Sequence, residues 1–188
     1  MPTPPRVHQL SARDGRSFAV FRLAEGDQPA LAAFNTQLSS QSRHFFLPHR
    51  YDQPTLDRAV QRSLAGDDTV FAAWDGAEIV GYYFLWYARR PVPLLGIGFA
   101  DRVQGLGLGR QAMDHLLAEA RRSDRDGVEL TTDLHNDRAY ALYQSCGFRF
   151  VRNVDNVTGD GSIRVERAMF LALKPTAQPM TEPHQAPV

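Results

Sequence analysis

Residues 94–110 read LLGIGFADRVQGLGLGR, and residues 111–122 after them carry the apolar period of a helix. The apolar run 94–99 predicts a buried strand, and glycines at alternate positions from Gly105 to Gly109 lead into the helix. The first turn of a helix has N–H groups without intrahelical partners, and its end of the macrodipole is positive. Because glycine has no Cβ, the backbone there can approach a phosphate closely. The order of strand, glycine turn and helix therefore predicts an anion-binding site.

Two well-known phosphate-binding motifs do not fit this turn. A dinucleotide-binding turn has the pattern G-x-G-x-x-G, but Arg110 stands where the third glycine would be. A P-loop requires G-x-x-x-x-G-K-[ST], and the sequence contains no such run. A turn that only packs a strand closely against a helix is the structural alternative, and a mononucleotide-binding α/β domain is a weaker functional one.

The run Gln104-x-x-Gly107-x-Gly109 resembles the Q/R-x-x-G-x-G/A signature of the GNAT superfamily of acyl-CoA N-acetyltransferases. Residues 136–148 are similar to that family's other signature, N-x-x-A-x-x-L-Y-x-x-x-G-F, and match it at every fixed position. Asn136 suits the N-cap of a helix, and Gly147 suits the position just after its end. The two signatures stand in the family's order, and the resemblance covers roughly residues 16–173.

Composition limits the partners that the chain is expected to have. The 188 residues carry a formal net charge of zero, which indicates neither a nucleic acid nor a membrane surface as a partner. The single cysteine, Cys146, leaves no internal disulfide and fits a reducing compartment. No signal peptide or transmembrane run is visible. We therefore expect a cytoplasmic protein, and we expect no metal.

The pattern predicts one domain with two loose ends. Residues 1–15 should be a flexible lead-in, residues 16–174 the GNAT domain, and residues 175–188 a disordered tail with four prolines. The order of elements predicts a mixed, twisted α/β sheet of about seven strands with helices on both faces. The expected strands are residues 17–23, 69–74, 78–87, 94–100, 128–134, 148–154 and 163–173, and the expected helices are residues 27–38, 54–64, 111–122 and one that starts at Asn136.

The resemblance implies a V-shaped opening between the fourth and fifth of these strands, where acetyl-CoA would bind as the co-substrate. The turn amides would hold its pyrophosphate, and a backbone N–H near Phe99 would bond the acyl carbonyl oxygen. Arginines in or near the two signatures would meet the phosphate charge. The expected cofactor-binding residues are Phe99, Ala100, Gln104, Gly105, Leu106, Gly107, Leu108, Gly109, Arg110, Asn136, Arg138 and Tyr143.

The resemblance also implies the chemistry of acetyl transfer to an amine. Tyr143 matches the family tyrosine that protonates the leaving thiolate. The base is left open: Glu129 and Asp133 alternate onto one strand face beside the opening. Other candidate bases are Glu78, His44, His135 and a chain of water molecules.

The acceptor site and the acceptor itself are less defined by the sequence. Phe45 and Phe46 follow a Ser-Arg segment that shapes the acceptor site in many family members, and Tyr83 belongs to an aromatic strand that could form an acceptor wall. The expected reaction moves an acetyl group from acetyl-CoA to a primary amine, of a small molecule or a protein, by direct attack in a ternary complex. The alternative is a non-catalytic acyl-CoA-binding sensor or partner module on the same fold. Dimers are common in that family, so a homodimer is one open state of assembly.

Overall fold

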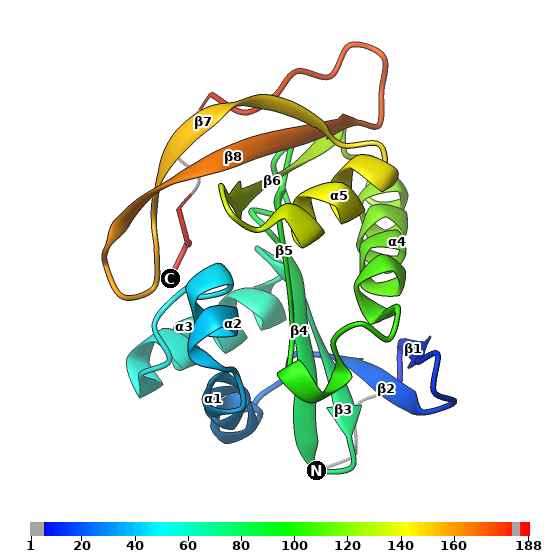
Figure 1. Cartoon of the computed structure of the whole chain (residues 1–188), viewed down its shortest axis with the longest axis vertical. Coiled ribbons are helices and arrows are strands. Elements are labelled where there is room, and N and C mark those ends of the chain that lie inside the picture. Colours follow the sequence, from blue (N-terminus) through cyan, green and yellow to red (C-terminus); the bar gives the residue numbers. More distant parts are fainter. Residues whose placement is uncertain (1–5, 182–184) are drawn as a thin grey trace.

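Eight strands form one open, mixed sheet in the computed structural model, which describes residues 6–181 and 185–188. Neighbouring strands are antiparallel except for β5 and β6, which run parallel, and the spatial order is β1-β2-β3-β4-β5-β6-β8-β7 (Figure 1). The expected mixed α/β sheet is thus confirmed. The strands are β1 His8–Ser11, β2 Ser17–Arg22, β3 Thr69–Asp75, β4 Glu78–Trp86, β5 Leu94–Phe99, β6 Gly127–Asp133, β7 Arg149–Val157 and β8 Ile163–Ala172.

Helices cover both faces of the sheet. Figure 1 shows α1, α2 and α3 gathered on one side of strands β3 to β5, and α4 on the other side. Short α2 lies in a stretch whose sequence is too irregular to predict a helix, and the Ser39 side chain caps it by accepting from Ser42 N at 3.1 Å. The helices are α1 Gln28–Thr36, α2 Ser40–Phe45, α3 Gln53–Ala65, the 3₁₀ turn η1 Asp101–Val103, α4 Leu108–Arg122 and α5 Asp137–Ser145.

Strand β4 lies at the centre of the core. Its residues Tyr82 and Tyr83 point to opposite faces by the period of a strand, yet both are 0% exposed. Both faces are apolar because α1 and α3 cover one and α4 covers the other. Helix α4 supplies its share of the core through a single buried face, made by Ala112, Met113, Leu116, Leu117 and Ala120.

The predicted flexible lead-in is wrong for residues 8–11, which form the edge strand β1, while its residues 1–5 lie outside the described part of the chain. This strand pairs antiparallel with β2 and buries Leu10 completely. The side chain of Gln111 on α4 holds Ser11 from both sides, accepting from its N–H at 2.9 Å and donating to its C=O at 2.7 Å. The partners of this strand come from distant parts of the chain, so its own sequence gives only a weak signal. The sheet therefore has eight strands rather than about seven.

The sequence predicts a disordered tail after Lys174, but its described residues 175–181 and 185–188 pack on the domain, and residues 182–184 lie outside the described part. Ala177 is only 7% exposed, and Met180 is held by two hydrogen bonds of its backbone. The C-terminus lies between the β7–β8 hairpin and helices α2 and α3 (Figure 1). The proline-rich sequence has no apolar period from which packing could be predicted. Single apolar side chains, those of Ala177 and Met180, nevertheless pack against the domain. No helix of the described part of the chain is long and apolar enough to cross a membrane.

Candidate active site

The sheet opens between β5 and β6. The register of these strands has one Cα pair, Leu94 with Glu129, and Glu129 N donates to Pro93 O at 3.1 Å. Beyond that pair β5 stays joined to β4 as far as Phe99, while β6 is joined to β8 as far as Asp133. The V-shaped opening that the family resemblance implied is therefore present, between the fifth and sixth strands because β1 adds one to the count.

The glycine turn lies at the end of β5 and starts helix α4. Gly107 is the N-cap of α4 and has a φ of 86°, a left-handed conformation that favours glycine. Gln104 fastens the turn, because its Nε2 donates to Phe99 O at 3.0 Å and to Ser42 Oγ at 3.1 Å. The first turn of α4 carries no acidic residue, so its free N–H groups and the positive end of its dipole are not offset. This arrangement suits a phosphate.

A cavity of about 650 Å³ extends from this turn into the opening. Of the expected cofactor-binding residues, only Ala100 and Leu106 do not line it. Ala100 is 1% exposed, and its N–H is used by Val80 O at 2.9 Å, whereas Leu106 packs against the core. The lining members are Phe99, Gln104, Gly105, Gly107, Leu108, Gly109, Arg110, Asn136, Arg138 and Tyr143.

Three arginines lie near the turn, and they differ in whether their guanidinium groups are already paired with a carboxylate. Arg110 is paired with Asp114 one helical turn away, at 3.2 Å. Arg138 lines the cavity beside Gly105, and Arg13 lines it beside Gly107. Within the described part of the chain neither Arg13 nor Arg138 has an ion pair, so both guanidinium groups can meet an anion. Sequence reasoning missed Arg13, since it lies in the segment expected to be flexible and no motif marks it.

Tyr143 lines the same cavity from helix α5. The Asn136 side chain caps that helix by accepting from Ala139 N at 3.1 Å, which fixes the helix start at the opening. The Tyr143 side chain is 8% exposed, and its hydroxyl has no hydrogen-bond partner among the residues described. Burial first, and then the charge of Glu166, raises the pKa of Tyr143 to about 12. The phenol therefore stays protonated at neutral pH and can donate a proton.

A second cavity adjoins the first on the side of α2. Phe45 and Phe46 line both cavities, as do Leu95, Gly96, Thr131 and Thr132, so the two spaces meet at the opening. Tyr83 does not line either cavity. Its hydroxyl lies 3.1 Å from His115 Nδ1 on the α4 side of the sheet. The aromatic wall comes from the other face of β4, where Phe84 and Trp86 stack with ring centroids 4.0 Å apart.

The two expected bases lie on the face of β6 that looks toward this second cavity, but neither lines it. Glu129 is 0% exposed beneath the tail, where its Oε2 accepts from Met180 N at 2.5 Å. Its Oε1 lies 3.8 Å from an Arg152 nitrogen. Asp133 accepts from His135 N at 2.7 Å and lies 3.3 Å from His44 Nε2. Both carboxylates are thus already occupied by partners from the protein.

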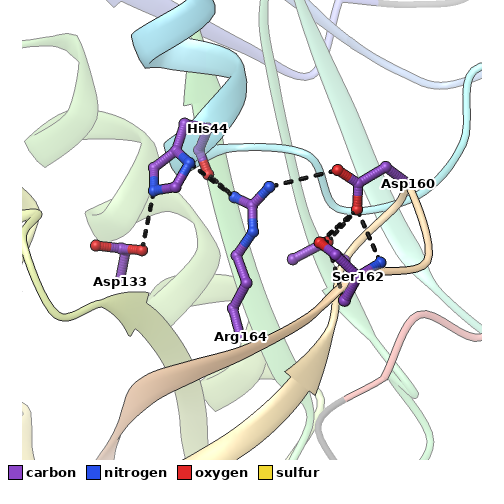
Figure 2. A network of polar contacts seen from close by, with 6 residues as sticks. His44, Asp133, Asp160, Ser162 and Arg164 are labelled. Carbon is purple, nitrogen blue, oxygen red and sulfur yellow. Dashed lines mark hydrogen bonds and ion pairs between the residues drawn. The ribbon is translucent and has the colours of Figure 1, made fainter.

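Figure 2 shows how Asp133 takes part in a polar network that ties α2 to the β7–β8 hairpin. His44 lies between Asp133 and Arg164, whose Nη1 donates to His44 O at 2.7 Å and lies 3.2 Å from its Nδ1. Arg164 in turn meets Asp160 at 3.4 Å, and Asp160 accepts from Ser162 N. Both ring nitrogens of His44 therefore already face polar partners. Because His44 lines the second cavity, this network fixes one wall of that cavity.

Of the other bases that the sequence left open, Glu78 is paired with Arg102 at 2.5 Å, away from both cavities, and His135 lines the first cavity. The acidic side chain that lines the second cavity is Glu166 of β8, which sequence reasoning did not single out. Ala186 of the tail also reaches this cavity. Among residues 6–181 and 185–188, no three His, Cys, Asp or Glu side chains are grouped to hold a metal ion.

A family model described as the Acetyltransferase (GNAT) family matches residues 33–148, which include the glycine turn and helix α5. The chain belongs to this family. The match covers more than half of the sequence and both segments on which the resemblance rested. The cofactor of this family is acetyl-CoA, and the residues lining the larger cavity fit such a ligand: free helix N–H groups and two unpaired arginines for phosphates, and the edge of β5 that β6 leaves unpaired for the pantetheine arm.

Known proteins share parts of the chain at modest identity. An "Uncharacterized N-acetyltransferase YvbK" of Bacillus subtilis is 31% identical over 80 residues, which is 42% of this chain. The chain thus aligns with only about half of that relative, 52% of its length.

Solved structures agree in fold. The GNAT domain of S. lividans PAT has a TM-score of 0.73 at 19% identity and covers 88% of this chain and 96% of its own. The Mycobacterium smegmatis RimJ, in complex with CoA-disulfide, has a TM-score of 0.71 at 16% identity and covers 93% of this chain and 90% of its own. The Salmonella typhimurium yncA, a putative acetyltransferase with its cofactor acetyl-CoA, has a TM-score of 0.65 at 20% identity, covering 87% and 98%.

Proposed function

We propose that this protein is an N-acetyltransferase that moves the acetyl group of acetyl-CoA to a primary amine by direct attack in a ternary complex. The observation that carries the proposal is the meeting of two cavities at the opening between β5 and β6. One cavity has the phosphate-binding turn, and the other has an aromatic wall and carboxylate. Residues such as Thr131 and Gly96 line both, so a thioester from one side and an amine from the other can come into contact.

Positioning supplies much of the rate in such a reaction. Holding two reactants in contact replaces an encounter in solution and can be worth about 7–11 kcal/mol of barrier in well-oriented cases. The β6-facing backbone of residues 96–99 is outside the register that joins β5 to β6. Apart from Phe99 O, which accepts from Gln104, its polar groups are available to the pantetheine arm and the acyl carbonyl. In this proposal an N–H near Phe99 stabilises the oxyanion of the tetrahedral intermediate.

Tyr143 is the proposed general acid. It lines the cofactor cavity from a helix whose start is capped at the opening, and burial keeps its hydroxyl protonated. When the carbon–sulfur bond breaks, the phenol can donate its proton to the departing thiolate. A module that only binds acyl-CoA needs no such donor, which favours the enzyme over the sensor reading.

The test is turnover with a panel of amines. The protein would be incubated with acetyl-CoA and small amines, amino acids or peptides while free thiol is followed and products are identified by mass spectrometry. Thiol release that depends on the amine, with one acetyl group added to it, supports the proposal. Tight acetyl-CoA binding by calorimetry with no acetylated product from any amine class would favour the binding module instead.

A further inference from the structure

Glu166 and Asn156 form a polar pair on the hairpin side of the second cavity. They lie on β8 and β7, and both line the cavity. Asn156 Nδ2 donates to Glu166 Oε2 at 2.8 Å and reaches Thr131 Oγ1 at 3.4 Å. Because Nδ2 faces the carboxylate, the orientation of the amide is fixed, and Oδ1 must point elsewhere. Thr131 belongs to both cavities, so the pair lies close to the opening.

Acceptor atoms of this pair are left without partners. Asn156 Oδ1 is buried and has no hydrogen bond within the described part of the chain. Glu166 is half-buried, and its hydrogen bond from Asn156 reaches Oε2, whereas no described donor meets Oε1. A buried oxygen without a donor, such as Asn156 Oδ1, costs about 1–3 kcal/mol, so native structures supply a protein group, an ordered water or a ligand as its partner. Two acceptors and one negative charge match a group with several N–H donors and a positive charge.

The surrounding charges do not neutralise Glu166. Arg164, two residues earlier on the same face of β8, is used by His44 of α2 and by Asp160. Arg167 donates to Leu134 O and pairs with Asp137 at 3.6 Å. Asp133 of β6 is the cross-strand partner of Glu166 and adds a second negative charge. Tyr143 of α5 is near enough for the Glu166 charge to contribute to its raised pKa, which links the pair to the proposed acid.

We infer that Glu166 and Asn156 bind the ammonium group of the acceptor, and that Glu166 is the base that takes its proton. This inference rests on the proposed acetyl transfer. At neutral pH an aliphatic amine is mostly a cation, with three N–H donors and no lone pair to attack with. Glu166 Oε1 and Asn156 Oδ1 accept two of these N–H groups, and the amine is held beside the opening. The acceptor class is therefore a cationic primary amine.

The proposed step balances its protons and electrons. As one ammonium proton passes to Glu166 and on to solvent, the nitrogen lone pair attacks the thioester carbon and the N–C bond forms. The carbonyl oxygen takes the π electrons, returns them, and the C–S bond breaks. Tyr143 gives its proton to sulfur and regains one from the second N–H through solvent. The third proton stays on the amide, so the products are an N-substituted acetamide, CoASH and one released proton.

The test uses Glu166→Gln, which keeps the side-chain shape and an oxygen that can accept from Asn156. The control is Asp155→Asn, which also removes one negative charge. Asp155 precedes Asn156 on β7, and its exposed side chain points to the face of the strand opposite to that of Asn156. At pH 7 we expect kcat/KM of Glu166→Gln for the amine to fall by roughly 10²-fold. The control should keep wild-type kinetics, and both variants should keep the wild-type affinity for acetyl-CoA.

The pH profile separates a base from a merely structural residue. Wild-type kcat/KM should be nearly flat from about pH 6 to 9 because the enzyme uses the ammonium form of an amine whose pKa is near 10. In Glu166→Gln it should rise about tenfold per pH unit because only the neutral amine can react. Asn156→Ala should raise KM for the amine more than it lowers kcat. A Glu166→Gln profile that stays flat with wild-type magnitude would overturn the inference.

The order of measurements keeps this failure apart from a failure of the proposed function. Wild-type protein is assayed first with acetyl-CoA and the amine panel. If no amine is acetylated, the proposed function fails. If an amine is acetylated but Glu166→Gln turns it over normally at every pH, acetyl transfer stands and the assignment of Glu166 is wrong. A melting curve of each variant shows that the folded protein is being compared.

Discussion

Leu94 of β5 and Glu129 of β6 are the pair at which the two halves of the sheet meet. From this pair the strands separate, and the residues on both sides of the gap line two adjoining cavities. A parallel contact this short leaves the backbone of the rest of β5 unpaired toward β6, which a closed sheet would not permit. The gap is therefore the feature on which the proposed meeting of two substrates depends.

Replacing Tyr143 with Phe tests the proposed acid. The ring keeps its packing beside Phe148, whose centroid is 6.2 Å away, and only the proton donor is lost. We expect kcat and kcat/KM to fall together by roughly 10²-fold, as for an interaction made only in the transition state. The measurement is thiol release together with a melting curve on one preparation. Normal turnover with a lower melting temperature would instead assign the tyrosine to packing.

Replacing Gly107 with Val tests the phosphate-binding turn. A φ of 86° disfavours a β-branched residue, and a Cβ there would lie 3.3 Å from Arg13 Nε. We expect a large loss of acetyl-CoA affinity in calorimetry, since both the turn and Arg13 must shift. Leu106→Ala is the control in the same turn. Because Leu106 does not line the cavity, this variant should bind acetyl-CoA normally. Equal affinities in folded Gly107→Val and wild type would refute the assignment.

Truncation after Lys174 tests the docked tail. It removes the packing of Ala177 and Met180 and uncovers Glu129, which Met180 N contacts at 2.5 Å. We expect the free energy of unfolding to fall by about 1–3 kcal/mol, the usual worth of burying one or two apolar side chains. The measurement is denaturation in urea. Unchanged stability would show that the tail does not hold this position in solution.

Removing residues 185–188 alone tests what the end of the tail does to the second cavity. Ala186 lines that cavity, and Tyr87 Oη donates to Gln185 O at 2.9 Å, while the contacts of Ala177 and Met180 remain. We expect a lower KM for the acceptor amine, because space is freed, with acetyl-CoA affinity and melting temperature nearly unchanged. Steady-state kinetics with varied amine is the measurement, and a raised KM would show instead that the segment helps to bind the acceptor.

His49 should make the stability depend on pH. Burial lowers its pKa from 6.5 to about 4, with Nε2 3.0 Å from the Tyr82 hydroxyl. Below pH 6.5 the His49 ring binds a proton in the unfolded chain but not in the folded chain. Its contribution to the free energy of unfolding is therefore fully present above pH 6.5 and is lost as the pH falls toward 4. The expected slope from His49 is about 1.4 kcal/mol per pH unit.

Urea denaturation of His49→Gln at pH 7, 6 and 5 checks this dependence. The variant has no titrating ring at this position. Its free energy of unfolding should therefore fall by about 1.4 kcal/mol less per pH unit than that of the wild type. His115 should leave a remaining slope, because burial also lowers its pKa to about 4. Identical slopes in the two proteins would mean that His49 is not the group that titrates.

Local patterns predicted the parts of the candidate site that are continuous in the chain. The glycine turn depends on residues 104–109 alone, and helix α5 depends on its own cap at Asn136 and on Gly147, so both could be found from spacing. Arg13 and Glu166 could not be found in this way. Each lies outside both motifs, and no local pattern distinguishes it from the other arginines or glutamates of the sequence.

The sequence by itself determined the family, the order of most strands and helices, and the turn and helix proposed to hold acetyl-CoA, because these depend on local period, caps and glycines. Only the tertiary structure decided that residues 8–11 form an edge strand and that the tail docks over Glu129. It also decided that Phe84 and Trp86 form the wall of the second cavity instead of Tyr83. Such choices depend on which distant surface covers a residue. In a strand that is buried on both faces, the alternation of side chains cannot show which face borders the cavity.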